Sequence, residues 1–255
     1  MWLVKIGTGN RNNPTILIDG GIHAREWISP AVVLYIIQQL VENKDNKHMI
    51  ENVNWYIIPV LNPDGYEYTF THERYWRRNR APIVGSSKCN GTDLNRNFDF
   101  HWGEAGTSAT PCSDLFRGRS AFDQLETRGL RDVVNRYKDQ IKLYVTFHSF
   151  AQVIVYPWGY TTELPENASE LQSLGEQVAA AIASVNGTVY GVANIPLVLP
   201  LGAGGSDDWV KGAGGIELSY TFELPGLNFE MPHSEILDVC VETFEGVKVY
   251  HSYIG

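Results

Sequence analysis

A histidine, an arginine and a glutamate occur together in the segment Gly20–Trp27, which reads GGIHAREW. The segment follows an apolar run, TILID, and precedes a helix-like one, SPAVVLYIIQQL. Packing alone does not bring polar groups of both charges to the end of a buried strand. Imidazole nitrogens and carboxylate oxygens bind divalent metals, so His23 and Glu26 are candidate ligands of one ion.

A catalytic zinc site uses three protein ligands and leaves a position for water, so a third ligand must come from elsewhere. Among the other histidines, only His148 repeats the setting of His23, because it ends the hydrophobic run KLYVTFHSF. In open α/β sheets, sites form beyond the carboxyl ends of the strands, where both histidines would meet. The sequence therefore predicts one Zn²⁺ bound by His23, Glu26 and His148.

Glu223 ends a third strand-like run, ELSYTFELPG, and could act as the general base beside a zinc-bound water. Each of these residues also has a purely structural interpretation. His23 would then be a loop histidine, Glu26 would pair with Arg25, His148 would be hydrogen-bonded in the core, and Glu223 would be exposed before a Pro-Gly turn.

Composition limits the class of protein. With 255 residues, of which 44% are hydrophobic, the chain can bury one large core, so we expect a single domain. The formal net charge of −9, without a clustered basic face, argues against nucleic-acid binding. No apolar stretch is long enough to span a bilayer, so we expect no membrane contact either.

Strand-like and helix-like runs alternate, which predicts an α/β fold with a mixed, mostly parallel twisted sheet and helices on both faces. Strands are expected at 15–21, 54–62, 141–149, 152–158 and 215–225. Helices are expected from Ser29, as N-cap with Pro30 following, and over 121–139, 165–187 and 235–253. The segment 63–120 is expected to be irregular, and a loop that long is usually functional.

The three cysteines suggest an oxidising compartment. Cys89 and Cys112 flank a segment rich in Gly, Asn and Ser, which suits a loop-closing disulfide. Cys240 has apolar neighbours at helical spacing and is expected to be a buried free thiol. Three N-glycosylation acceptor triplets, starting at Asn90, Asn167 and Asn186, add to the indication that the protein is secreted.

Seven segments, distributed over essentially the whole chain, resemble the motifs of the zinc carboxypeptidases of the pancreatic A/B type. In order they are GGIHAREW, VLNPDGYEYT, RYWRRNR, GTDLNRNFD, TFHSFAQVIVYPWGY, GGSDDW and YTFELPG. The resemblance implies a secreted enzyme with one Zn²⁺ that hydrolyses the C-terminal bond of peptides and proteins. It also implies proteinaceous carboxypeptidase inhibitors or a pro-segment as partners. Residues 1–255 would form the catalytic domain, without the pro-segment and without the family's first helix and edge strand.

The resemblance also implies roles for individual residues in the reaction. His23, Glu26 and His148 match the family's zinc ligands, and Glu223 matches its general base. Arg80, the last arginine of RYWRRNR, is matched to the residue that polarises the scissile carbonyl and stabilises the oxyanion.

Further residues match the family's substrate-binding positions. Asn95 and Arg96 match the pair that binds the terminal carboxylate of the substrate, a task that suits a planar guanidinium. Asp93 matches the carboxylate that orients a zinc-bound histidine, here His23. Arg25 and Arg77 match positions along the outer subsites, although they could equally be plain surface arginines.

Asp207 matches the base of the pocket for the terminal side chain, where an aspartate goes with Lys or Arg. Alternatively, Asp207 or Asp208 caps the helix that follows. Two departures from the family concern the substrate. Pro200 stands where the family has a mobile tyrosine, which suggests weaker substrate binding, and Phe150 replaces another tyrosine. The competing hypotheses are an inactive zinc-binding relative that captures peptide C-termini and an A-like enzyme for apolar C-termini.

Overall fold

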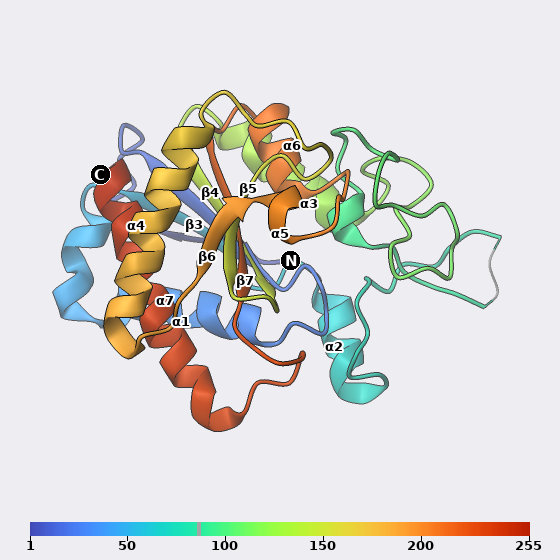
Figure 1. The fold of residues 1–255 in the computed structure, drawn as a ribbon, viewed down its shortest axis with the longest axis horizontal. Coiled ribbons are helices and arrows are strands. Elements are labelled where there is room, and N and C mark those ends of the chain that lie inside the picture. The colour runs from blue at the N-terminus through green and yellow to red at the C-terminus, as the bar shows by residue number, and fades with distance from the viewer. Residues whose placement is uncertain (86–87) are drawn as a thin grey trace.

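The residues that the computed structural model describes, 1–85 and 88–255, form a seven-stranded twisted sheet at the centre of the molecule (Figure 1). Its strand order is β1-β3-β2-β4-β7-β5-β6. Strands β2 and β3, β2 and β4, β4 and β7, and β5 and β6 pair in parallel, whereas β1 and β5 run antiparallel to β3 and β7. The bounds are β1 Val4–Ile6, β2 Thr15–Gly20, β3 Asn54–Ile58, β4 Ile141–Ser149, β5 Val153–Tyr156, β6 Gly191–Asn194 and β7 Leu218–Leu224. The expected mixed, mostly parallel sheet is confirmed.

Helices cover both faces of this sheet, as predicted (Figure 1). One face packs against α1 Ile28–Glu42, α4 Ala168–Asn186 and α7 His233–Ile254, and the other against α3 Leu125–Tyr137 and α6 Ser206–Gly212. The shorter helical elements are η1 Lys44–Ile50, α2 Pro63–Thr71, η2 Leu94–Arg96 and α5 Ile195–Val198. None of the helices in the described residues has the length and apolar character needed to cross a membrane.

The two central strands present different chemistry to the two faces, because side chains alternate along a strand. On β4 and β7, the residues that pack into the core under α1, α4 and α7 are Leu143, Val145, Phe147, Leu218, Tyr220, Phe222 and Leu224. The intervening residues face the α3 and α6 side, and they are Tyr144, Thr146, His148, Ser219, Thr221 and Glu223. Period-two alternation therefore places the chemically active side chains together on one face.

The segment 63–120 is more ordered than expected, because α2 lies within it. The Asn62 side chain accepts a hydrogen bond from the Gly65 N–H at 3.0 Å, and Pro63 occupies the first turn. This is a regular N-terminal cap, followed by a helix too short and too polar to show an apolar stripe. The Cys89–Cys112 disulfide is present, and Cys240 is a buried free cysteine, both as predicted.

The prediction that Ser29 caps α1 is wrong. The helix begins at Ile28 after Trp27, so Ser29 lies inside the first turn. Its buried hydroxyl donates to the Phe147 carbonyl at 2.6 Å and accepts from the Gly21 N–H at 2.9 Å. Ser29 thus joins the start of α1 to the ends of β2 and β4, where His23 and His148 follow.

Replacing Ser29 with Ala should lower the free energy of unfolding by about 1–3 kcal/mol, because two buried backbone groups lose their partner. Chemical denaturation would measure the change. The control is Ser184→Ala, because the exposed Ser184 hydroxyl bonds only to the Ala181 carbonyl within its own helix. Equal stability of S29A and S184A would contradict this account of Ser29.

Candidate active site

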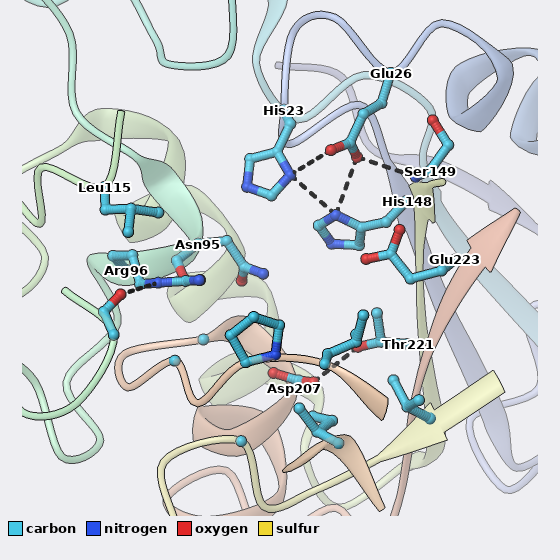
Figure 2. A pocket seen from close by; sticks show the side chains of 18 of the residues that line it. His23, Glu26, Asn95, Arg96, Leu115, His148, Ser149, Asp207, Thr221 and Glu223 are labelled. Atoms are coloured by element: carbon cyan, nitrogen blue, oxygen red, sulfur yellow. Dashed lines mark hydrogen bonds and ion pairs between the residues drawn. The ribbon is translucent and has the colours of Figure 1, made fainter. Parts of the chain in front are cut away.

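Three predicted ligands converge at the carboxyl ends of β2 and β4. His23 and Glu26 lie in the turn between β2 and α1, and His148 lies near the end of β4. His23 Nδ1 is 2.8 Å from Glu26 Oε1, and His148 Nδ1 is 3.1 Å from both Glu26 Oε2 and His23 Nδ1. Figure 2 shows the three side chains pointing toward one another.

This donor set fits a divalent metal ion. One potential ligand atom from each residue lies within 4.8 Å of the others, and all three side chains are buried. Two imidazoles and one carboxylate are a ligand set of hydrolytic zinc enzymes, and tetrahedral bonds of about 2.0–2.1 Å place ligand atoms about 3.3 Å apart. The observed separations are close to that value, and two ring nitrogens facing each other at 3.1 Å need a proton or a cation between them. His23, Glu26 and His148 would therefore hold the ion.

The charges in this cluster are strongly coupled. Burial works to raise the pKa of the Glu26 carboxyl, but the two imidazoles outweigh it and hold the pKa below its usual range. Burial also works to lower the pKa of His148, but Glu26 raises it to about 9. Burial and Arg77 lower the pKa of His23. Because zinc needs neutral imidazoles, metal binding would displace the proton that Glu26 favours on His148.

Asp93 and Arg77 contact the His23 ring and each other. Asp93 Oδ1 is 3.2 Å from His23 Nε2, the nitrogen that faces away from Glu26. Arg77 donates from Nε to Asp93 Oδ2 at 3.0 Å, and its Nη1 lies 3.3 Å from His23 Nδ1. A carboxylate on the outer nitrogen of a ligating histidine fixes the ring orientation and the tautomer. Arg77 lines the same cavity as the cluster rather than an outer position.

The structure contradicts the role predicted for Arg80. Its guanidinium lies 3.6 Å from the centroid of the Tyr68 ring, and Arg80 lines a separate cavity with Asp64 and Glu126. The motif RYWRRNR contains four arginines, and spacing alone did not distinguish among them. A backbone hydrogen bond distinguishes Arg77 from the other arginines. The Arg77 carbonyl accepts from the Ala24 N–H at 3.0 Å, and this bond holds Arg77 beside His23.

Glu223 stands next to the cluster without belonging to it. It is the register partner of His148 in the parallel β4–β7 pair, and Figure 2 shows its carboxylate beside the His148 ring. Burial raises the pKa of the Glu223 carboxyl to about 7, against the opposing effect of His148. A carboxylate in this position can accept a proton from a water molecule in the cavity.

Asp207 lies in the same cavity, of about 450 Å³, in the first turn of α6. It is 5% exposed, and its Oδ2 accepts from the Thr221 hydroxyl at 2.7 Å. The helix N-cap is Gly205, so neither Asp207 nor Asp208 caps α6. Asp208 does not line the cavity and accepts from the Gly159 and Tyr160 N–H groups. Only Asp207 is directed into the cavity.

Asn95 and Arg96 lie on the cavity wall between the metal-binding group and Asp207 (Figure 2). The Asn95 side-chain oxygen accepts from the Ser206 N–H at 2.9 Å, which leaves its amide NH₂ directed toward the cavity. Arg96 donates from Nε to the Gly106 carbonyl at 3.0 Å and from Nη1 to the Asn95 carbonyl at 2.7 Å. These bonds fix the plane of the guanidinium.

The segment around Pro200 forms an apolar wall of the cavity. Leu199, Pro200 and Leu201 all line it. The Gly202 N–H donates to the Gly159 carbonyl at 2.9 Å, and the Ala203 N–H donates to the Ala105 carbonyl at 2.9 Å. The segment is therefore fastened on two sides immediately after Pro200.

Two aromatic side chains line another part of the cavity. Phe150 and Phe229 line it, with ring centroids 5.0 Å apart. Arg25 does not line the cavity; its guanidinium lies 4.2 Å from the Phe229 ring centroid. Phe229 and Thr221 were not among the residues predicted from the sequence. Thr221 could have been found from its position two residues before Glu223, on the same face of β7.

Comparisons with known proteins agree with this arrangement. Residues 1–246 match the family model described as zinc carboxypeptidase. The chain is 44% identical to carboxypeptidase B of Astacus astacus, with all of this chain and 85% of that protein covered. It is 40% identical to human carboxypeptidase B, again over the whole chain, but it spans 62% of the length of that protein. The crystal structure of a carboxypeptidase A from Helicoverpa armigera superposes with a TM-score of 0.94 at 36% identity, over 99% of this chain and 64% of that one.

The fold and the buried His-Glu-His group together define a metallocarboxypeptidase. The chain belongs to the zinc carboxypeptidase family.

Zinc content tests the ligand group. We expect one Zn²⁺ per chain by metal analysis, and His23→Ala should lose most of it because only two ligands remain. At a free zinc concentration of 100 times the Kd, the ion should add about 2.7 kcal/mol of stability to the wild type. His101→Ala is the matched control, because His101 is a partly exposed histidine whose Nδ1 lies 3.1 Å from Glu104 on the surface. A full complement of zinc in H23A would contradict the assignment.

Proposed function

We propose that this protein removes C-terminal residues from peptides by zinc-dependent hydrolysis, with preference for terminal Lys or Arg. The observation that carries the proposal is a buried carboxylate, Asp207, in one cavity with the His23, Glu26 and His148 group. A buried carboxylate is stabilised by a cationic partner, and the basic side chain of a terminal Lys or Arg supplies one. The relatives named carboxypeptidase B support the same preference.

Recognition of the chain end falls to Asn95 and Arg96. The Asn95 amide NH₂ and the Arg96 guanidinium face the cavity between Asp207 and the metal group. Charge-assisted hydrogen bonds from a guanidinium suit a carboxylate, and only the end of a peptide chain has a free one at that place. The terminal side chain then extends to Asp207, and the last peptide bond lies beside Glu223.

In the reaction, a zinc ion supplies Lewis acidity and a water of lowered pKa. Glu223 accepts a proton from the attacking water at its carboxylate and then delivers a proton to the leaving amine. Arg77, rather than Arg80, provides the positive charge that faces the developing oxyanion. Asp93 keeps both Arg77 and His23 oriented for this step.

The similarity to the zinc carboxypeptidases also suggests where the protein acts and which other partners it binds. The Cys89–Cys112 disulfide fits an oxidising compartment, which agrees with secretion. A bovine relative of known structure, 33% identical to this chain, is in complex with tick carboxypeptidase inhibitor. We infer that proteinaceous inhibitors can bind the open cavity of this protein as well.

The test uses peptides that differ only in their last residue, Arg, Lys, Phe or Leu, followed by mass spectrometry. We expect shortening of the Arg and Lys peptides only, and no shortening of their C-terminally amidated forms. Chelation and Glu223→Gln should each stop the reaction, the latter without loss of zinc. Cleavage of the Phe or Leu peptide instead would overturn the role of Asp207. Zinc binding without any cleavage would favour a protein that only captures C-termini.

The kcat values of two variants distinguish the role of Arg77 from that of Arg80. Arg77→Met should lower kcat by about 10²–10³-fold, the typical cost of removing one oxyanion contact. Arg80→Met should leave kcat near the wild-type value, since Arg80 lines another cavity. Steady-state kinetics on the Arg peptide would measure both. A large loss of kcat in R80M alone would restore the role expected from the sequence.

A third prediction concerns the specificity of the cavity. Asp207→Asn should lower kcat/KM for Lys and Arg peptides by at least about 30-fold, because a buried charge partner worth about 2 kcal/mol or more is removed. The value for the Leu peptide should fall much less. Parallel losses for the Leu and Lys peptides would mean that Asp207 supports the fold of the cavity rather than its selectivity.

A further inference from the structure

A row of buried polar side chains lies on the same face of the sheet as the ligands, about two residues earlier along the strands. Thr146 precedes His148 by two residues, Thr221 precedes Glu223 by two, and the two threonines are register partners. Asp19 on β2 is the register partner of Thr146. Asp19 and Thr146 are 0% exposed and do not line the cavity, so neither can contact a substrate. The proposed mechanism makes no use of either residue.

Asp19 connects the two strands that deliver the histidine ligands. Its Oδ2 accepts from the Tyr144 hydroxyl at 2.6 Å, and its Oδ1 accepts from the Thr146 hydroxyl at 2.8 Å. Both donors are on β4, whereas Asp19 is on β2, four residues before His23. The carboxylate thus joins β2 to β4 just below the place where His23 and His148 meet.

Joining the strands does not require a charge. Hydroxyl donors also bond to neutral acceptor oxygens, and burying an ionised carboxylate costs several kcal/mol unless a positive charge lies near. Burial raises the pKa of Asp19 to about 6, although the two hydroxyls and His148 oppose it, so the group is ionised at pH 8. Asp207, from α6, is the anionic neighbour on the other side and raises that pKa further.

The positive charge that would compensate Asp19 belongs to the metal cluster. His148 attracts the Asp19 carboxylate across the row, and a divalent cation between His23, Glu26 and His148 would attract it more strongly. In a buried site such an attraction is screened little by solvent. A protonated His148 supplies one positive charge in the empty cluster, whereas a bound divalent cation would supply two, so the Asp19 carboxylate is compensated better once a cation is bound.

We propose that Asp19 is a positioning residue of the metal site, one that joins β2 to β4 and favours a divalent cation over an empty cluster through its buried negative charge. The proposal rests on the zinc site of the proposed function, but it does not depend on peptide cleavage.

The decisive variant is Asp19→Asn, which keeps the shape and one acceptor oxygen, removes the charge, and loses one of the two hydroxyl hydrogen bonds. Zinc affinity, measured by competition with a chromogenic chelator at pH 8, should fall about 10-fold or more, the range found for groups that support metal ligands. The matched control is Thr146→Val, which removes one hydrogen bond and keeps the charge, and its zinc affinity should fall less than that of D19N.

Thermal unfolding separates this role from a merely structural one. The native pKa of Asp19 is raised above its unfolded value, so the ionised carboxylate lowers metal-free stability at pH values above about 6. Metal-free D19N should therefore melt at or above the temperature of metal-free T146V at pH 8, because both variants lose one hydrogen bond and only T146V keeps the buried charge, while its gain in melting temperature on adding zinc should be smaller than that of T146V. If Asp19 were purely structural, D19N and T146V would gain equally in melting temperature on adding zinc.

Zinc affinity of D19N within twofold of the wild type, or a loss no larger than that of T146V, would overturn the proposal. A wild-type chain that bound no zinc would overturn it too. A chain that binds zinc but cleaves no peptide would overturn only the proposed function and leave the role of Asp19 standing.

Discussion

The site depends on the parallel pairing of β2 with β4. Because these strands are neighbours and point the same way, the turn after one and the end of the other place two imidazoles and a carboxylate at one buried point. Three such groups cannot lie 2.8–3.1 Å apart in an apolar interior without a cation or shared proton. Ser29, Asp93 and Asp19 each hold one side of this arrangement, from α1, from the long connecting segment and from the sheet beneath.

The regular part of the fold could be predicted, because its signals are local. Long apolar runs located the central strands, boundary residues such as Pro30 and Asn186-Gly187 located α1 and α4, and apolar spacing located α7. The predictions failed for short elements: α2 has nine residues and β6 has four, too few for a periodic pattern to emerge. The N-terminus of α1 was also misplaced, because the Ser29 hydroxyl has better partners in the sheet than in its own helix.

The site was only partly accessible from the sequence. Residues that end strands, such as His148 and Glu223, could be located from the hydrophobic pattern and the rule that parallel strands end at one edge. Arg77 and Arg80 could not be distinguished in that way, because their positions depend on a connecting segment whose path is determined by single backbone hydrogen bonds. Thr221 and Asp19 were overlooked for a different reason: a threonine or aspartate inside a strand has no unusual spacing, and its importance arises only from what it touches.

The loop closed by the Cys89–Cys112 disulfide contains only some of the site residues. The closed loop contains Asp93, Asn95 and Arg96, whereas His23, Glu26, His148 and Glu223 lie outside it. A crosslink of this kind restricts the unfolded segment and so favours its ordered form. Loss of the bond in a reducing environment would loosen the wall that binds the end of the peptide. The metal group would be affected only indirectly, through the contact of Asp93 with His23. The redox state of the surroundings would then act on substrate affinity before it acted on zinc.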